Sequence, residues 1–203
     1  MLGSQQDQAT ALQKRALRTQ LKAARRLVDS QLQREAADFA ARAIMQLPEW
    51  SSARCLASYL PLNGEFDPSP IDKAAREQDM TVVYPRIVGP GMLEFSQWSP
   101  GETLDTVQHG LQQPSQTATA QRLSDIDIIL VPLVGWDAQG GRLGYGGGYY
   151  DRGLTAMNAL TVGLGFECQQ VMAVPRENHD QLLKVVVSEK QRYRFHLSNT
   201  VNA

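Results

Sequence analysis

The sequence predicts an α/β fold with three layers, in which helices cover both faces of a mostly parallel central sheet. Short apolar segments alternate with segments of helical periodicity along most of the chain, as in parallel α/β domains. Residues 126–134 are apolar almost throughout, as expected of a buried central strand, and a glycine-rich segment follows them. With 203 residues, 42% of them hydrophobic, we expect one domain over residues 1–203, with residues 1–8 and 198–203 flexible.

Two helices are predicted in the N-terminal region. Residues 5–28 contain no proline, and apolar residues recur among them at helical spacing: Leu17, Leu21, Ala24 and Val28. We expect this long helix to pack on the central sheet. A basic stripe runs beside the apolar one and consists of Lys14, Arg18, Lys22 and Arg25. By its pattern alone, this stripe is either a solvated surface or a binding surface. A second helix is expected from Ser30, where Ser30 and Gln33 form a capping-box pattern, to just before Pro48.

The later elements are shorter and alternate in type. Strands are predicted at residues 55–60, 81–84, 92–98 (an edge strand), 126–134, 160–166 and 185–188. Helices are predicted at residues 68–78, opened by Asp67, and at residues 149–159. Residues 117–124 favour neither type. Because ligands of such sheets bind outside the carboxyl ends of the strands, we expect a site in the loop after Val134.

Composition and charge exclude several classes of protein. The net charge of −1 gives no overall field that would attract nucleic acid or an anionic membrane. No apolar run approaches the roughly 20 residues of a membrane span, and the polar start lacks the apolar core of a secretory signal. We therefore expect a cytoplasmic protein without a nucleic-acid or membrane partner. Cys55 and Cys168 have no metal-ligand spacing, so both are expected to be buried thiols.

The glycine-rich segment, residues 140–152, is the strongest functional signal. Six of the nine residues from Gly140 to Gly148 are glycine, and arginines, tyrosines and an aspartate accompany them. Glycines let backbone N–H groups approach an anion, and the next helix can direct its N-terminus at a phosphate. Two common phosphate-binding motifs do not fit this segment. The motif GxxxxGK, followed by serine or threonine, needs a lysine where Tyr149 stands. The motif GxGxxG needs a glycine at position 149 or 151, where the chain has Tyr149 and Asp151. A plain linker is the alternative, but linkers carry few aromatic residues or arginines.

Four segments together resemble the 5-formyltetrahydrofolate cyclo-ligase family, also called methenyltetrahydrofolate synthetases. They are KRALR at residues 14–18, YLPLNGEFD at 59–67, RLGYGGGYYDR at 142–152 and VPRENHD at 174–180. The third is quite specific to the family. The resemblance implies a three-layer enzyme that uses ATP and Mg²⁺ to convert 5-formyltetrahydrofolate to 5,10-methenyltetrahydrofolate, releasing ADP and phosphate. The expected partners are these two small-molecule substrates, bound to a monomer or weak homodimer.

The resemblance also implies roles for individual residues. The ATP-binding residues would be Lys14, Arg18, Arg142, Leu143, Gly144, Tyr145, Gly146, Gly147, Gly148, Tyr149 and Tyr150. The folate substrate would contact Leu60, Glu65, Tyr145, Gly146, Gly147, Gly148 and Tyr149. The catalytic residues would be Arg142, Tyr149 and Tyr150. Asp151 and Asp180 would bind Mg²⁺, which typically takes one or two carboxylates beside phosphate oxygens and waters. No role is implied for Lys22, Arg25 or His179.

Several of these residues keep a second interpretation. Tyr149 and Tyr150 could be core aromatics, Asp151 could cap the helix after the glycines, and Glu65 could be an exposed turn charge. Arg86 is either near the ligand or on the surface.

Two positions depart from the family pattern. Gln113 replaces the usual carboxylate in GLQQP at residues 110–114, and Lys184 stands where an acidic residue often follows His179 and Asp180. These departures leave metal affinity, substrate preference and turnover open.

Two other classes of function fit parts of the sequence. A phosphosugar isomerase or CoA-transferase-like protein would share the predicted layers, because a fold does not determine a function. A nucleic-acid binder would use the basic stripe of the first helix and would show steeply salt-dependent affinity.

Overall fold

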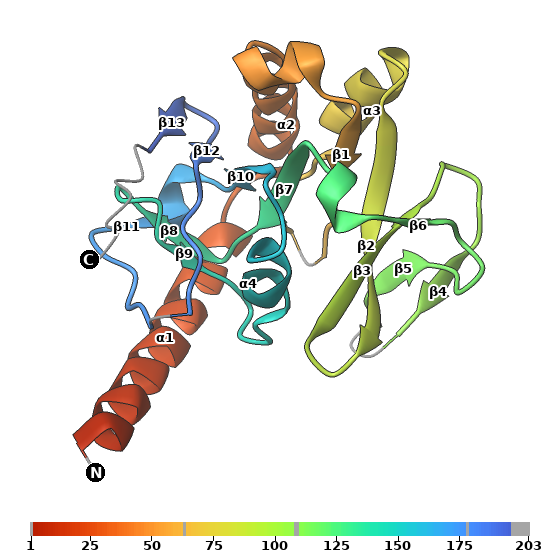
Figure 1. The fold of residues 1–203 in the computed structure, drawn as a ribbon. Helices are drawn as coiled ribbons and strands as arrows, with labels where there is room; N and C mark the ends of the chain where they lie inside the picture. Colours follow the sequence, from red (N-terminus) through yellow and green to blue (C-terminus); the bar gives the residue numbers. More distant parts are fainter. Residues whose placement is uncertain (1, 63, 108–109, 178, 196–203) are drawn as a thin grey trace.

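The computed structural model describes residues 2–62, 64–107, 110–177 and 179–195 (Figure 1). Of the segments expected to be flexible, residue 1 and residues 198–203 lie outside the described residues, whereas residues 2–8 belong to a helix. Within the described ranges, no helix is both long and apolar enough to cross a membrane.

The centre of the fold is an eight-stranded sheet with the order β13-β12-β10-β7-β1-β2-β3-β6. Its strands are β1 (Cys55–Ala57), β2 (Thr81–Gly89), β3 (Met92–Gln97), β6 (Ala120–Gln121), β7 (Ile128–Pro132), β10 (Leu160–Leu164), β12 (Val185–Val187) and β13 (Arg192–Arg194). The run β12-β10-β7-β1-β2 is parallel, and the outer pairings are antiparallel. The prediction of a mostly parallel sheet is confirmed.

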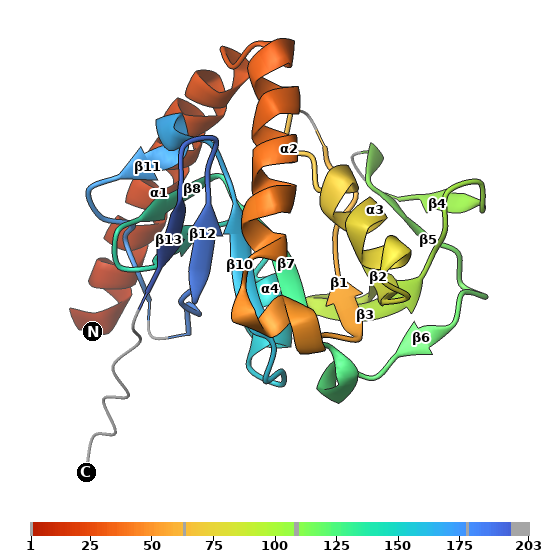
Figure 2. The same ribbon diagram turned by 90° about the horizontal axis from the view of Figure 1, so that it is seen from above.

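Helices cover both faces of this sheet (Figure 2). They are α1 (Leu2–Arg26), α2 (Ser30–Met45), α3 (Ser69–Glu77) and α4 (Tyr149–Leu154), with short 3-10 helices at Pro48–Ser52, Leu123–Asp125 and Glu167–Gln169. Alanines of α2 and α3 share one core cluster with Leu56 and Leu130 of the sheet, whereas Leu154 of α4 packs on the opposite face with Val131. The three-layer prediction is therefore confirmed.

Helix α1 lies beside a second, three-stranded sheet, which follows the central strand β7. This sheet has the order β11-β8-β9, with β8 (Gly135–Asp137), β9 (Arg142–Leu143) and β11 (Gln170–Val171). Leu21 of α1 is buried against Val134, Leu143 and Val174. Figure 1 shows the N-terminal half of α1 extending beyond the rest of the molecule. This packing directs one face of α1 toward the glycine-rich segment.

Strands β1 and β7 are neighbours in the sheet, and the chain that follows each of them adds its next parallel strand on the opposite side. After β1 it continues through α3 to β2, and after β7 it continues through α4 to β10 on the other side. A crevice opens outside the carboxyl ends of the strands at such a reversal, and it is the usual ligand position in open α/β sheets. Leu60 and Glu65 follow β1, and the glycine-rich segment follows β7. The topology thus brings two of the four family-like segments together.

Four local predictions are wrong. Of the two cysteines expected to be buried, only Cys55 is, because Cys168 is exposed. The residue that caps α2 is Asp29, whose Oδ1 accepts hydrogen bonds from the Gln31 and Leu32 amides, so Ser30 and Gln33 form no capping box. Strand β3 is not an edge strand, because β6 pairs with it. Helix α4 ends at Leu154 rather than at residue 159, just after Gly153, because glycine disfavours continuation. The hairpin of β4 (Leu104–Thr106) and β5 (Gln112–Pro114) was not predicted.

Asp72 of α3 provides a test of core electrostatics away from the predicted site. Asp72 is 4% exposed, and its Oδ2 accepts a 2.8 Å hydrogen bond from the Tyr84 hydroxyl. Burial raises the pKa of Asp72 from 3.8 to about 6, despite hydrogen bonds that lower it. Because the folded pKa is the higher one, Asp72 favours the folded state most below pH 3.8, and this stability is lost as the pH rises through 6.

Asp72→Asn is therefore expected to raise the free energy of unfolding by about 2 kcal/mol at pH 8, because a rise of the pKa from 3.8 to about 6 corresponds to at most about 3 kcal/mol. The gain should shrink as the pH falls toward 4.5. Urea unfolding at both pH values measures it, with Asp38→Asn on the exposed side of α2 as the matched control. An equal gain at both pH values would contradict the assignment.

Candidate active site

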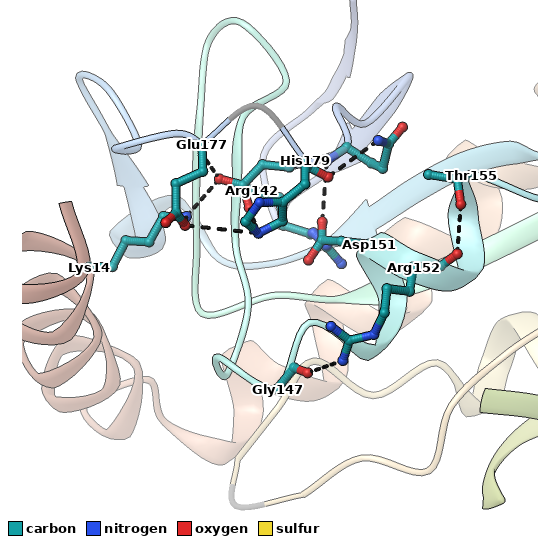
Figure 3. Close-up of polar contacts among 10 residues, drawn as sticks. Lys14, Arg142, Gly147, Asp151, Arg152, Thr155, Glu177 and His179 are labelled. Atoms are coloured by element: carbon teal, nitrogen blue, oxygen red, sulfur yellow. Dashed lines mark hydrogen bonds and ion pairs between the residues drawn. The ribbon is translucent and has the colours of Figure 1, made fainter. Parts of the chain in front are cut away.

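Four segments meet at the carboxyl edge of the parallel strands. They are the middle of α1, the segment after β1, the glycine loop with the start of α4, and the segment around Asp180 (Figure 3). By glycine loop we mean residues 144–148. Gly146 and Gly148 have φ angles of 108° and 65°, which favour glycine. A Cβ on Gly146 would lie 3.3 Å from the Arg18 guanidinium carbon. Both the backbone conformation and the close approach of Arg18 therefore require the glycine.

Lys14 is buried between two carboxylates. Its Nζ lies 2.6 Å from Glu177 Oε2 and 2.6 Å from Asp180 Oδ2, and its side chain is 9% exposed (Figure 3). Burial alone would lower the pKa of Lys14, but the hydrogen bonds with Asp180 and Glu177 outweigh this effect and raise it. The pKa of Asp180 is lowered in turn, since the bonds from Lys14 and the Glu177 amide outweigh burial. The ammonium group is therefore charged and held in one place.

The remaining members of the basic stripe contact the glycine loop. Arg18 Nε donates to the Gly144 carbonyl oxygen at 2.8 Å. Lys22 Nζ lies 4.5 Å from the centroid of the Tyr145 ring, and Arg25 Nη2 donates to the Tyr145 hydroxyl at 3.0 Å. The stripe is thus not a solvated surface, and Lys22 and Arg25, which had no implied role, also belong to this site.

Arg142 and Asp151 form a buried ion pair. Arg142 Nη2 bonds to Asp151 Oδ1, and the side chains are 3% and 17% exposed. The same Asp151 oxygen accepts from the Gln181 amide at 3.2 Å. Gly148 occupies the N-cap position of α4, and no side chain caps that helix. Asp151 is therefore not a helix cap; it connects the glycine loop to the segment around Asp180.

The two adjacent tyrosines have different surroundings. The Tyr150 ring packs edge-on against Phe95 with centroids 6.5 Å apart, and the Arg142 guanidinium lies 5.9 Å from its centroid. The Tyr150 hydroxyl is buried, and among the described residues it has no hydrogen-bond partner. Burial first, and then the negative charge of Glu65, raise the pKa of this phenol. The ring of Tyr150 is thus a core aromatic, whereas a contact of its hydroxyl with a substrate stays a prediction.

Glu65 is buried, which excludes the exposed turn charge. It is 9% exposed, and its Oε2 accepts from the Leu62 amide at 2.8 Å. Burial raises its pKa, although hydrogen bonds with Tyr145 and the Leu62 amide act in the opposite direction. Leu60 is partly buried and packs against the hydrophobic core. Asn63 lies outside the described residues.

Arg152 joins the glycine loop to the β2–β3 hairpin. Its Nη2 donates to the Gly147 carbonyl oxygen at 2.5 Å (Figure 3). Its Nε donates to the Gly91 carbonyl oxygen at 2.8 Å. Its guanidinium carbon lies 5.8 Å from the centroid of the Tyr149 ring. Arg152 therefore holds the C-terminal end of the loop, as Arg18 holds its start.

The acidic residues suit a hard cation. Glu177, His179 and Asp180 each offer one ligand atom, and these atoms lie within 4.8 Å of one another. Carboxylate oxygens are the protein ligands that Mg²⁺ prefers, so Glu177 and Asp180 fit that ion better than His179 does. Asp151 is not part of this group, but its contact with Gln181 places it next to the same segment. Glu177 was missed as a candidate, although it stands inside the VPRENHD segment.

The positions that depart from the family pattern have structural contacts. Gln113 Oε1 accepts from the Ile87 amide at 3.0 Å, and Lys184 Nζ donates to the Ala159 carbonyl oxygen at 2.9 Å. Arg86 pairs with Glu94 at 2.5 Å and is mostly buried, so it is not a surface arginine. Among these contacts none involves the glycine loop.

The chain is similar to known proteins in both sequence and fold. Residues 10–189 match the sequence profile of the 5-formyltetrahydrofolate cyclo-ligase family. The 5-formyltetrahydrofolate cyclo-ligase of Escherichia coli K12 is 30% identical over 84% of this chain and 97% of its own. That of Haemophilus influenzae is 29% identical over 81% and 91%. Among solved structures, the 5,10-methenyltetrahydrofolate synthetase of Aquifex aeolicus has a TM-score of 0.79 at 27% identity, covering 94% of this chain and 96% of the other. The chain therefore belongs to the 5-formyltetrahydrofolate cyclo-ligase family, a family of ligases.

Proposed function

We propose that the protein cyclises 5-formyltetrahydrofolate to 5,10-methenyltetrahydrofolate at the expense of ATP. The observation that carries this proposal is the position of the glycine loop, which contacts a basic helix face on one side and lies next to a buried carboxylate, Glu65, on the other. One loop can thus adjoin an anionic and a heterocyclic ligand at the same time.

The nucleotide side consists of Lys14, Arg18 and residues 142–150. Backbone N–H groups of a glycine loop and fixed cations suit a triphosphate, because both supply positive charge without moving. Arg18 donates a hydrogen bond to the Gly144 carbonyl oxygen, so its positive charge lies next to the glycine loop.

The folate side consists of Leu60, Glu65 and the loop residues from Tyr145 to Tyr149. A buried carboxylate can accept hydrogen bonds from the N–H groups of a pterin ring, and Leu60 can pack against the ring face. Glu65 suits this task because it is held by the Leu62 amide and shielded from water.

The proposed reaction has two steps. The formyl oxygen attacks the γ-phosphorus of ATP, so that a P–O bond to this oxygen forms and the P–O bond to ADP breaks. N10 of the folate then attacks the activated formyl carbon, the C–O bond to phosphate breaks, and N10 loses its proton. Such steps require positioning and charge neutralisation more than covalent catalysis. Arg142 and Tyr150 are placed to meet these needs, since the Arg142 guanidinium lies 5.9 Å from the centroid of the Tyr150 ring, whose buried hydroxyl has no hydrogen-bond partner among the described residues. Tyr149 adjoins the same loop.

Asp151 and Asp180, together with Glu177, would hold Mg²⁺. When bound, the ion would offset the negative charge of the phosphates during transfer. The protein's own part is to keep these carboxylates in place, through Arg142 and Gln181 for Asp151 and through Lys14 for the other two. A cytoplasmic location and a monomeric or weakly dimeric state stay predictions.

The test is to incubate the purified protein with 5-formyltetrahydrofolate, ATP and Mg²⁺ and to follow the absorbance of the methenyl product. We expect product formation that depends on both ATP and Mg²⁺, with omission of each as the control. Absence of ATP-dependent product would refute the proposal. Turnover of a phosphosugar without nucleotide would instead favour an isomerase.

A further inference from the structure

The proposed ATP site does not explain the position of Arg25, the last residue of the basic stripe. Arg25 is 4% exposed, although it carries a charge and lies near the end of a surface helix. Its Nη2 donates to the Tyr145 hydroxyl at 3.0 Å, and Lys22 covers the ring of the same tyrosine. Two cations of α1 therefore converge on one side chain of the glycine loop.

Tyr145 connects Arg25 to Glu65 through its hydroxyl group. The Tyr145 hydroxyl, which accepts from Arg25, is also hydrogen-bonded to the Glu65 carboxylate. Glu65 Oε2 also accepts a hydrogen bond from the Leu62 amide, which belongs to the same turn. Tyr145 is thus a long-range hydrogen-bond partner of Glu65, and Arg25, which orients Tyr145, also acts on that carboxylate through its charge.

We propose that Arg25 is a positioning residue for the folate substrate and acts through Tyr145 on Glu65. This inference rests on the proposed function. Lys14 and Arg18 contact the acidic segment and the start of the loop, whereas Arg25 contacts Tyr145, so one face of α1 serves both substrates at different turns. A hydrogen bond from a charged donor is shorter and stronger than a neutral one, so it can hold the Tyr145 hydroxyl in place.

Steady-state kinetics with each substrate varied in turn tests this role. Arg25→Ala should raise the KM for 5-formyltetrahydrofolate about 10-fold, the effect of losing one hydrogen bond to a charged group. The KM for ATP should stay within about two-fold, because the contact of Arg18 is retained. Tyr145→Phe should have a similar effect, and the double variant should be no worse than either single one, because both changes break the same chain of contacts.

The controls separate positioning from general damage. Arg26→Ala removes a charge from the exposed neighbouring position and should change neither KM. Arg25→Lys should recover part of the folate KM, because an ammonium group can still donate to Tyr145. If Arg25→Ala does not fold, Arg25→Met keeps the aliphatic packing and tests the same point.

Two outcomes would overturn the inference while the proposed function stands: an active wild-type enzyme with an unchanged folate KM in Arg25→Ala, or additive effects in the double variant. A wild-type protein without ATP-dependent turnover would refute the proposed function and this inference together.

Discussion

Asp151→Asn is expected to lower turnover at saturating ATP by at least about 100-fold and to destabilise the fold as well. Turnover falls because the amide removes a charged ligand from the proposed Mg²⁺ site. Stability falls by about 3 kcal/mol, because Arg142 is almost fully buried and loses its anionic partner. Kinetics at several Mg²⁺ concentrations and urea unfolding measure the two effects separately.

A second variant distinguishes these roles of Asp151. Combining Arg142→Gln with Asp151→Asn removes both buried charges and should recover much of the stability while turnover stays low. Asp38→Asn, on the exposed side of α2, is the matched control. Full turnover of Asp151→Asn at limiting Mg²⁺ would show that this carboxylate is not needed for the reaction.

Lys14→Ala is expected to raise the KM for ATP about 10- to 100-fold, the range for losing a hydrogen bond to a charged group. The folate KM should change little, since the contacts of Lys14 are with Glu177 and Asp180 rather than with Glu65. Initial rates with each substrate varied measure both constants. Arg15→Ala, at the exposed neighbouring position, controls for loss of charge on α1.

The pH dependence of the Lys14 effect follows from its partners. The pKa of Lys14 lies above 10.5 and that of Asp180 below 3.8. The ion pair therefore contributes stability that is lost only as the pH rises through the raised pKa of Lys14 or falls through the lowered pKa of Asp180. The ratio of mutant to wild-type KM should stay constant between about pH 6 and about pH 9. A ratio that changes steeply in this interval would show that another group controls ATP binding.

The order and type of the main elements could be predicted because each has a clear periodicity. The stripe that includes Leu21 specifies a helix, and the apolar run that contains β7 specifies a central strand. The small sheet of β8, β9 and β11 could not be predicted, since its strands of two or three residues contain charged or polar residues and form no apolar run like those of the equally short β1 and β12.

The candidate site was predictable where its residues cluster along the chain. The glycine-rich segment brings Arg142, the tyrosines and Asp151 together within a dozen residues. The contacts between Lys14 and Glu177, and between Arg25 and Tyr145, join positions 163 and 120 residues apart. No local pattern encodes such pairs, because they arise only once the topology has placed α1 beside the loops.

The bond from Arg152 to the β2–β3 hairpin has a consequence for how such a sequence can diverge. Gly91 has a φ of 70°, and a Cβ there would lie 2.4 Å from Arg152 Nη2. Two separate constraints thus act on position 91, one from its own backbone and one from a side chain 61 residues away. In a relative without an arginine at position 152, only the positive φ would still favour glycine at position 91. Positions 91 and 152 should therefore vary together among relatives.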